Sequence, residues 1–468
     1  MNNQLAKDAA EFHQLLDRVK QQGLAYFEAL DNRPTSTTAR LSERNSLPFH
    51  GLGTEGALAS FNQRLEPLIV ASSGPRYWGF VTGGTTPAAI AGDWLATVYD
   101  QNTQSEHGNG DNSAQIELET IQLLLELFDL PKDYLGGFVT GATMSNFTAL
   151  AVGRQWLGQQ KGLDIAKEGV TTPMKVLTAT PHSSALKSLA LLGMGSNNII
   201  KVNVAAGNRE AIDLNDLKTQ INHLKGEPFV LISSGGTVNT VDFDDFEAIA
   251  QLKEQHQFWW HIDAAFGGFA ACSPAHKHLV NGWDKADSIT VDCHKWLNVP
   301  YESAVFLIKE KHRNLQVETF QNSNAPYLGD PLENFTYLNF LPENSRRLKA
   351  LPAWFTLMAY GKEGYREMVE HNINHALQFG AFIEADDSFE LLAPVRLNTV
   401  CFTLSGTEGQ AKVTPFLQAV NDTGQVFMTP TVYQGKKGIR AAFVNWRTTS
   451  QDIERVTETM KNIILKTR

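Results

Sequence analysis

The chain has 468 residues, of which 42% are hydrophobic and 19% are charged, a composition typical of a globular protein with a sizeable core. Its 50 acidic and 40 basic residues give a formal net charge of −10, which argues against a nucleic-acid-binding protein. Three cysteines are too few for a disulfide framework, the N-terminus lacks the pattern of a signal peptide, and no apolar run approaches the length of a membrane span. These features predict a cytoplasmic protein without nucleic-acid or membrane partners.

The N-terminal segment, residues 1–74, begins with one amphipathic helical pattern. Apolar side chains recur at helical spacing from Leu5 to Val19, and Pro34 with the polar residues after it ends the pattern. No neighbouring segment offers an obvious apolar partner for this face. We therefore expect the helix to pack on another surface, such as that of a second subunit.

Strand and helix patterns alternate in the middle of the chain, within residues 75–345. The strand patterns are rich in β-branched and aromatic residues, and they lie at 175–180, 198–204, 228–234, 258–266 and 288–294. Helical patterns separate most of them. This alternation predicts βαβ units, hence an α/β domain with a parallel sheet covered on both faces. In such sheets ligands bind at the carboxyl ends of the strands.

The last part of the chain, residues 346–468, has a different character. A long helical pattern spans 348–385, with an expected kink at Pro352 and a break at 361–364. Three strand patterns follow, separated by helical or turn segments. We expect a smaller α+β domain here.

The stretch DSITVDCHKW places Lys295 between two strand patterns that both look buried. A buried cation is unfavourable unless it is paired or made neutral. Lysine becomes neutral when its amine forms a Schiff base with a carbonyl compound such as pyridoxal phosphate. The alternative is a lysine at the edge of the sheet whose charge reaches water.

Three other segments with polar or small side chains fall at or near expected strand ends. Small residues in TGATMSN, at 140–146, would let backbone amides at a helix N-terminus approach a phosphate. His182 precedes a helix and would offer a flat ring for stacking, whereas Asp263 closes an apolar strand and would pair with a ring nitrogen. Each segment also has a plain structural explanation: a tight turn, a packed histidine and a turn-forming aspartate.

Together these features follow the order of one binding set: phosphate cradle, stacking ring, carboxylate and amine. The chain resembles the group II pyridoxal-phosphate-dependent amino-acid decarboxylases, which include glutamate, aromatic amino-acid and cysteine sulfinate decarboxylases. The resemblance runs from GPRYWGF at Gly74 to VNWRTTSQDI near the C-terminus, and the combination of PHSS, HIDAA and HKW is its specific part. It implies the aspartate aminotransferase fold (fold type I), with a mainly parallel, seven-stranded type of sheet in the large domain.

The resemblance also implies roles for individual residues. Lys295 would hold pyridoxal 5'-phosphate as an internal aldimine, and Asp263 would face its pyridine nitrogen. Ala265 would lie under the ring, while His182 would stack on it and assist the substrate. The other residues expected to bind the cofactor are Thr143, Met144, Ser145, Thr237 and His294.

Two positions depart from the family pattern. Cys293 stands where relatives usually have proline, which adds a free N–H and a thiol beside the lysine. Near the start of the core domain the chain has GPRYW where relatives often have HPR, so a histidine is missing from that region.

Decarboxylation ends with a proton delivered to the substrate carbon, and relatives use a tyrosine on a mobile loop before an arginine pair. Tyr337 lies nine residues before Arg346, so we predict that Tyr337 is this donor, in its own or the partner's active site. The alternative is an aromatic side chain packed within the loop at 326–343. The resemblance also implies a homodimer with shared active sites, across which the N-terminal helix at 3–30 would pack.

The substrate is an amino acid whose class stays open at this stage. A side-chain cation would favour an acidic amino acid, and aromatic side chains near the start of the core domain would favour an aromatic one. The residues concerned are Arg76 and Arg440 on the one hand and Trp78, Phe80 and Trp94 on the other, with Thr82 as a further expected substrate contact.

Three rival activities stay open on the same sequence. An aminotransferase or aldehyde synthase would use the same scaffold. A carbon–carbon lyase acting on a phosphorylated amine would need an extra basic pocket, and no such cluster is evident. A non-catalytic binding protein would be expected to have lost the lysine or the aspartate, and Lys295 and Asp263 are both present. The decarboxylase is therefore our prediction, with no metal site expected.

Overall fold

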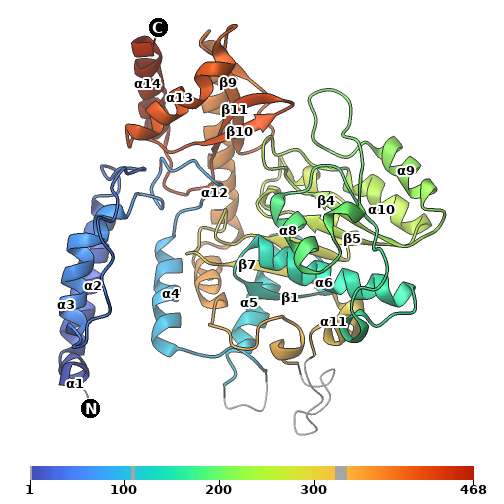
Figure 1. The fold of residues 1–468 in the computed structure, drawn as a ribbon, viewed down its shortest axis with the longest axis horizontal. Helices are drawn as coiled ribbons and strands as arrows, with labels where there is room; N and C mark the ends of the chain where they lie inside the picture. The colour runs from blue at the N-terminus through green and yellow to red at the C-terminus, as the bar shows by residue number, and fades with distance from the viewer. Residues whose placement is uncertain (1–2, 107–110, 322–334, 468) are drawn as a thin grey trace.

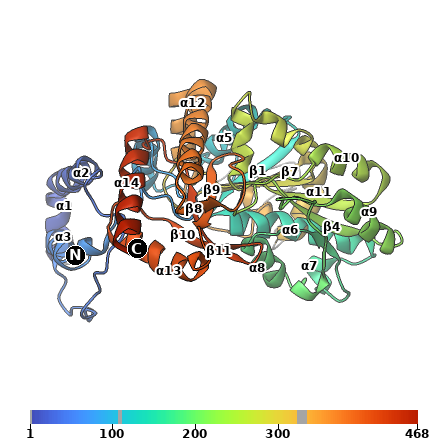
Figure 2. The same cartoon turned by 90° about the horizontal axis from the view of Figure 1, so that it is seen from above.

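A computed structural model describes residues 3–106, 111–321 and 335–467 (Figure 1). It has three parts in chain order: a group of N-terminal helices, a large α/β unit and a smaller α+β unit. Figure 2 shows the N-terminal helices at one end of the molecule, next to the C-terminal helix and away from the large sheet.

Two helices, rather than one, form from the N-terminal amphipathic pattern. They are α1 (Asn3–Ala10) and α2 (Phe12–Glu28), and the chain returns along them as α3 (Gly53–Arg64). Asp8 accepts hydrogen bonds from the backbone and hydroxyl of Thr54 at 2.9 and 2.6 Å, which ties α1 to the start of α3. The expected apolar face is present but exposed: Phe12, Leu16 and Val19 keep 60, 48 and 46% of their surface accessible.

A seven-stranded sheet forms the large unit, in the order β1-β7-β6-β5-β4-β2-β3. Only β7 runs antiparallel to its neighbours in this sheet, so the predicted mainly parallel sheet of fold type I is confirmed. The strands are β1 (Tyr134–Val139), β2 (Val176–Thr178), β3 (Ile199–Lys201), β4 (Phe229–Ser234), β5 (Phe258–Asp263), β6 (Ser288–Val291) and β7 (Ala304–Lys309).

Helices cover the faces of this sheet, and α6 packs along β5, β6 and β7. Aspartates at the N-caps of α9 and α10 accept hydrogen bonds from backbone N–H groups of the first turn, as expected for such residues. Within the described residues, no helix has the length and apolar character needed to cross a bilayer. The helices are α4 (Pro87–Tyr99), α5 (Ala114–Leu127), α6 (Ala142–Gln160), α7 (Ile165–Glu168), α8 (Ser183–Leu191), α9 (Leu214–His223), α10 (Phe246–Gln255) and α11 (Arg313–Phe320).

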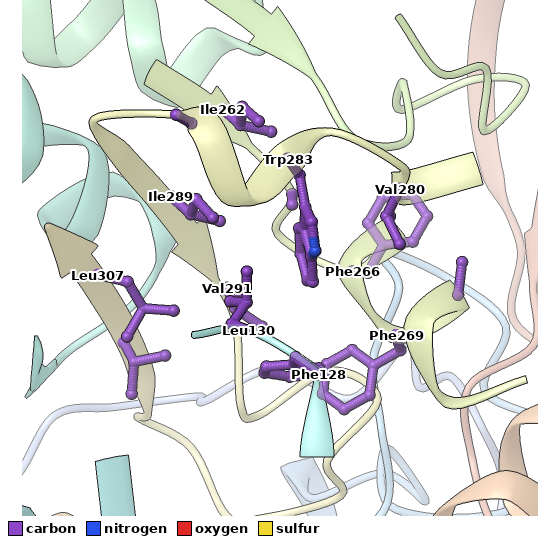
Figure 3. Close-up of a cluster of buried hydrophobic side chains, with 14 of the residues drawn as sticks. Phe128, Leu130, Ile262, Phe266, Phe269, Val280, Trp283, Ile289, Val291 and Leu307 are labelled. Atoms are coloured by element: carbon purple, nitrogen blue, oxygen red, sulfur yellow. The ribbon is translucent and has the colours of Figure 1, made fainter. Parts of the chain in front are cut away.

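A buried aromatic cluster supports the side of the sheet that faces away from α6. In Figure 3, Ile262 and Ile289 from adjacent strands point toward the ring of Trp283, and Phe128 lies close to Phe269. The rings of Phe128 and Phe269 meet edge to face with centroids 5.2 Å apart. This cluster fixes β5 and β6 from behind, immediately before the positions where both strands end.

The small unit is built on the long helix α12 (Ala350–Ala385). The predicted break is confirmed at Gly361, which has a positive φ of 57°. The predicted kink at Pro352 is wrong, because this proline lies in the first turn of α12. Backbone N–H groups of a first turn have no carbonyl partner within the helix, so a proline there removes no helical hydrogen bond. The other elements are β8 (Phe389–Leu391), β9 (Thr399–Leu404), α13 (Gly409–Asp422), β10 (Thr429–Tyr433), β11 (Lys436–Ala442) and α14 (Ser450–Thr467), with the strands in the antiparallel order β10-β11-β9-β8.

The helix α12 connects the two units. Its first half contributes Ala353 and Leu357 to the core of the large unit, and its second half contributes Phe379 and Ile383 to the core of the small one. We keep 1–74, 75–345 and 346–468 as our proposed division of the chain, with α12 as the element shared across the second boundary.

Candidate active site

The candidate site lies at the carboxyl ends of β5 and β6. Asp263 is the last residue of β5, and Lys295 follows four residues after the end of β6. Because neighbouring parallel strands end at the same edge of a sheet, the two side chains come together there. The backbone N–H of Asp292 donates to the carbonyl of Ala265 at 2.8 Å and joins the two turns.

The Lys295 ammonium is paired with a carboxylate that the sequence analysis did not single out. Its Nζ lies 2.7 Å from Oδ2 of Asp292, and the Phe266 ring centroid is 5.6 Å away. The other oxygen of Asp292, Oδ1, is buried, lies 3.8 Å from Nε2 of His294 and has no hydrogen-bond partner within the described part of the chain. The backbone of Lys295 is equally constrained, since a Cβ placed on Gly83 would lie 1.9 Å from the Lys295 carbonyl oxygen.

Asp263 is buried and receives only hydrogen-bond donors at its side chain. Oδ2 accepts from Nδ2 of Asn146 at 3.0 Å, and Oδ1 accepts from the backbone N–H of Ala265 at 3.3 Å. Ala265 itself is partly buried beside this carboxylate, as expected for the small residue under a flat ring.

His182 is the N-cap of α8, and its Nδ1 accepts from the backbone N–H of Ser184. Partial desolvation lowers the pKa of His182; the charge of Asp263 opposes this shift, and the positive charges of Lys295 and Arg440 add to it. The three charged residues that act on His182 come from different parts of the chain: Asp263 from β5, Lys295 from the segment after β6, and Arg440 from β11. The structure therefore brings His182, Asp263, Lys295 and Arg440 into one site.

The phosphate cradle predicted from the sequence lies at the N-terminus of α6. Gly141 is its N-cap, and a Cβ there would come 3.3 Å from Cε1 of His294. Thr143 is exposed and Met144 is half-buried at this end of the helix. Ser145 is turned away instead: its hydroxyl bonds the Val305 carbonyl at 2.9 Å inside the sheet, so the predicted side-chain contact with phosphate is not formed.

His294 closes the other side of this cradle. Its Nδ1 accepts from the backbone N–H of Ser303 at 3.2 Å, which leaves Nε2 as the donor of the neutral ring. Burial lowers the pKa of His294. Its ring lies 4.3 Å from that of Tyr301, and the Tyr301 hydroxyl donates to Oγ1 of Thr82 at 3.4 Å. Thr82 is thereby linked to His294 through Tyr301, and its contact with the substrate stays a prediction.

Two other predicted residues face different partners. Oγ1 of Thr237, expected to bind the cofactor, donates to Glu210 at 2.6 Å instead of pointing to Asp263. Arg440 is buried and donates from one terminal nitrogen to the Val238 carbonyl at 2.7 Å, while its Nε has no hydrogen-bond partner among the described residues. Burial lowers the pKa of Arg440.

Two of the aromatic and basic residues considered for substrate binding have structural roles. Arg76 is buried against Asp452 at 2.6 Å, and Trp78 packs in the core of the small unit. Trp94 is exposed on α4.

Phe80 differs from these residues, since its side chain is 60% exposed and it stands two residues before Thr82. Both Phe80 and Val81 have positive φ values, 58° and 59°. Such strained positions are found preferentially at ligand sites.

Tyr337 is not brought into this cluster. It lies in a short 3-10 turn, is fully buried, and its hydroxyl donates to the Gly136 carbonyl at 3.2 Å. The Arg346 guanidinium lies 4.3 Å from the centre of its ring. Burial raises the pKa of Tyr337 well above its usual value. Part of the loop predicted at 326–343 lies outside the described residues, and the role of Tyr337 stays a prediction.

The clustered residues fit pyridoxal phosphate. Lys295 offers an amine for the aldehyde, Asp263 offers a carboxylate for the pyridine nitrogen, and the α6 N-terminus offers backbone amides for the phosphate. The buried Asp292 oxygen without a partner supplies one further acceptor beside the amine. Cys293 is fully buried and burial raises its pKa, so its thiol stays protonated and unreactive.

Sequence reasoning missed Asn146, His261, Asp292 and Tyr301. Asp292 and Tyr301 flank the HKW motif, so their spacing from Lys295 was an available signal. The link between Asn146 and Asp263 joins positions 117 residues apart, and only the packing of α6 on the sheet creates it.

Comparison with known proteins agrees with this site. The pyridoxal-dependent decarboxylase conserved domain matches residues 42–405. An aromatic-L-amino-acid decarboxylase from Bacillus atrophaeus is 27% identical over 97% of this chain and 95% of that protein. A 4-hydroxyphenylacetaldehyde synthase from Rhodiola rosea is 22% identical over 86% of this chain and 85% of that protein. The crystal structure of Oryza sativa TDC with PLP and tryptamine superposes with a TM-score of 0.90 at 20% identity, covering 98% of each chain.

The family match spans more than half of the chain, and the fold, the amine and the carboxylate of the site agree with it. It confirms the resemblance inferred from PHSS, HIDAA and HKW. The chain belongs to the pyridoxal-dependent decarboxylase family and is a pyridoxal-phosphate-dependent carboxy-lyase that acts on an amino acid.

Proposed function

We propose that this enzyme decarboxylates an aromatic L-amino acid at the site formed by Lys295, Asp263 and His182. The observation that carries this assignment is the placement of an amine and a buried carboxylate at the ends of adjacent parallel strands, with His182 within range of both charges. We further propose that the protein is cytoplasmic, which its three unpaired cysteines support.

Each residue of the site has a defined task. Bound pyridoxal phosphate would draw electrons from the substrate's α-carbon so that the carboxylate leaves as CO2. Asp263 would hold positive charge at the pyridine nitrogen, and Lys295 Nζ would hold the cofactor through its aldehyde, whose oxygen leaves as water. Asp292 Oδ2, at 2.7 Å from that Nζ, is placed to take the proton that the amine releases. His182 would cover the ring and exclude water from it.

The aromatic assignment is supported by two exposed rings beside Thr82. Phe80 and Tyr301 are 60 and 61% exposed; the Tyr301 hydroxyl bonds Thr82, and Phe80 stands two residues before Thr82 in the chain. Exposed aromatic rings bury apolar surface when an aromatic ligand packs against them. The activities named for the Bacillus atrophaeus and Oryza sativa relatives are in line with this class.

A second candidate substrate is an acidic amino acid, and Arg440 favours it. The guanidinium is buried, sits close enough to lower the pKa of His182, and has an Nε without a partner. A carboxylate on the substrate side chain would satisfy that nitrogen.

We also propose that the enzyme is a homodimer with shared active sites. The stripe formed by Phe12, Leu16 and Val19 lies on one face of α2 and is largely exposed in the single chain. A second copy of the chain would bury this stripe, in keeping with the apolar character of permanent subunit interfaces.

Replacing the amine tests the cofactor assignment. Lys295→Ala should remove the visible absorbance of the bound cofactor and lower CO2 release on the order of 10³-fold or more. The reason is that the variant lacks the amine that we assign to the aldehyde of the cofactor. Lys277→Ala, at an exposed lysine, is the control and should behave like the parent. Parental activity in Lys295→Ala would refute the assignment, and aldehyde with ammonia in place of amine would indicate an aldehyde synthase.

Two tyrosine variants test the proton donor. If Tyr337 is the donor, Tyr337→Phe should keep cofactor absorbance but lower amine formation by roughly 10² to 10⁴-fold. Tyr301→Phe is the matched variant, since it removes a phenol that lies next to His294 and Thr82. Parental amine formation in Tyr337→Phe with a loss in Tyr301→Phe would move the role to Tyr301. Mixing Lys295→Ala and Tyr337→Phe chains should restore activity if Tyr337 acts in the partner's site.

A substrate panel distinguishes the two substrate classes. The parent should release CO2 from aromatic amino acids, and Phe80→Ala should raise their KM by roughly two- to tenfold. Arg440→Leu should leave aromatic substrates nearly unchanged. Preference of the parent for acidic substrates, with a roughly 10- to 100-fold loss in Arg440→Leu, would instead establish the second candidate.

The subunit proposal is tested at the exposed stripe of α2. The double variant Leu16→Glu/Val19→Glu should shift the protein toward monomers in size-exclusion chromatography with light scattering, because it places charges in an apolar interface. Gln14→Glu, on the opposite face of the same helix, should leave the assembly intact. A fully active monomeric parent would contradict the proposal.

A further inference from the structure

A row of polar side chains is buried beneath the site, on one face of β5. Trp259, His261 and Asp263 alternate along the strand, so all three point to the face that α6 covers. His261 and Trp259 are fully buried. Buried polar groups of this kind are stable only when each finds a hydrogen-bond partner, and here every partner can be traced.

The first links of the row have a fixed direction. The Trp259 indole can only donate, and its Nε1 bonds Oγ of Ser288 at 3.0 Å. The Ser288 hydroxyl keeps its own hydrogen to donate, and Nδ1 of His261 lies 2.9 Å from it as an acceptor. Burial lowers the pKa of His261 to about 4, which favours the neutral ring with a single proton.

The next link is Asn146 on α6. Its Oδ1 lies 2.8 Å from Nε2 of His261 and accepts a hydrogen bond from the N–H there. Both N–H groups of the amide are then left as donors. One N–H bonds Asp263 at 3.0 Å and the other bonds Oγ of Ser184 at 3.0 Å. The opposite amide orientation would place Oδ1 against a carboxylate that only accepts. The carboxylate end of the row therefore fixes the amide orientation, which places the proton of His261 on Nε2, and the Ser288 end is compatible with it.

The second branch ends at His182. Oγ of Ser184 accepts from Asn146, so its own hydrogen is free for Nδ1 of His182, 2.7 Å away. The backbone N–H of Ser184 donates to the same nitrogen at 3.2 Å. Nδ1 is thus an acceptor, and the neutral His182 ring carries its proton on Nε2.

We propose that His261 is a positioning residue that, through Asn146, sets the hydrogen bonding of the two groups assigned to the cofactor. The N–H at Nε2 of His261 bonds Oδ1 of Asn146 and so holds the amide in the orientation that points both of its N–H groups at Asp263 and Ser184. That orientation gives Asp263 a donor, which suits the carboxylate that faces a protonated pyridine nitrogen, and it gives His182 the Nε2–H tautomer. The cofactor roles of Asp263 and His182 rest on the proposed function, whereas the direction of the row rests on the hydrogen bonds alone.

The direct test uses the parental protein, with histidine rings labelled with nitrogen-15 and observed by NMR. His182 and His261 should both appear as neutral Nε2–H tautomers, with each assigned by the signal lost in His182→Gln and His261→Gln. A Nδ1–H tautomer at His261, or at His182, would overturn the proposal. This measurement needs neither bound cofactor nor activity.

The consequence is tested by cofactor affinity, measured as the dissociation constant of pyridoxal phosphate. Asn146→Asp keeps the shape but removes both donors, so it should weaken binding by roughly 10- to 100-fold, the range for a lost hydrogen bond to a charged group. Ser288→Ala, the milder change at the outer end of the row, should weaken binding in the same direction by less. The dissociation constant of Ser288→Ala also tests the proposal if Asn146→Asp does not fold.

Asn398→Asp is the matched control, because Asn398 is also fully buried and donates to a backbone carbonyl in the small unit. Its affinity for pyridoxal phosphate should equal that of the parent. Parental affinity in both Asn146→Asp and Ser288→Ala, or an equal loss in Asn398→Asp, would overturn the proposal. Failure of the proposed function has a different signature: Asp263→Asn would then keep parental cofactor affinity while the histidine tautomers stay as described.

Discussion

The parallel pairing of β5 with β6 is the constraint on which the rest of the site depends. The register places Asp263 opposite Thr290, so the turn that carries Lys295 starts beside the turn that carries Ala265. Both strands are completely buried, and the aromatic cluster behind them leaves no room for a shift. A one-residue slip would turn the whole polar row of β5 to the wrong face. Amine and carboxylate are therefore positioned by the core before any ligand contributes.

Helix α6 depends on the same sheet for its position. Ser145 was expected to bind phosphate, yet its hydroxyl holds the first turn of α6 to Thr290 and Val305 within the sheet. Farther along the helix, a Cβ on Gly153 would lie 2.8 Å from Cδ1 of Trp259, so the glycine lets α6 approach the strand closely. These contacts fix the helix N-terminus against the sheet and bring Asn146 within reach of His261. The serine thus anchors the helix end that we propose as the phosphate cradle.

The sequence predicted the features that depend on local pattern and missed those that depend on packing. Alternating strands and helices indicated the mainly parallel sheet, and motif order placed Lys295, Asp263 and His182 at its edge. Thr237 follows the expected strand, but its side chain is bound by Glu210, a partner 27 residues away that no local pattern marks. The amphipathic N-terminal pattern predicted a helix correctly but not its interruption at Glu11, since a single turn of broken helix leaves the apolar spacing almost unchanged.

The place where the two units meet explains why substrate class was the hardest property to infer. Arg440 belongs to β11 of the small unit, yet its guanidinium bonds the Val238 carbonyl of the large one and its charge acts on His182. Thr82 lies in the segment before α4 and bonds Tyr301, whose ring packs on that of His294 beside Lys295. The cofactor end of the site is thus built from strand ends within one sheet, whose neighbours follow from topology. The substrate end is assembled from distant segments that meet only by docking, and docking geometry leaves no periodic trace in sequence.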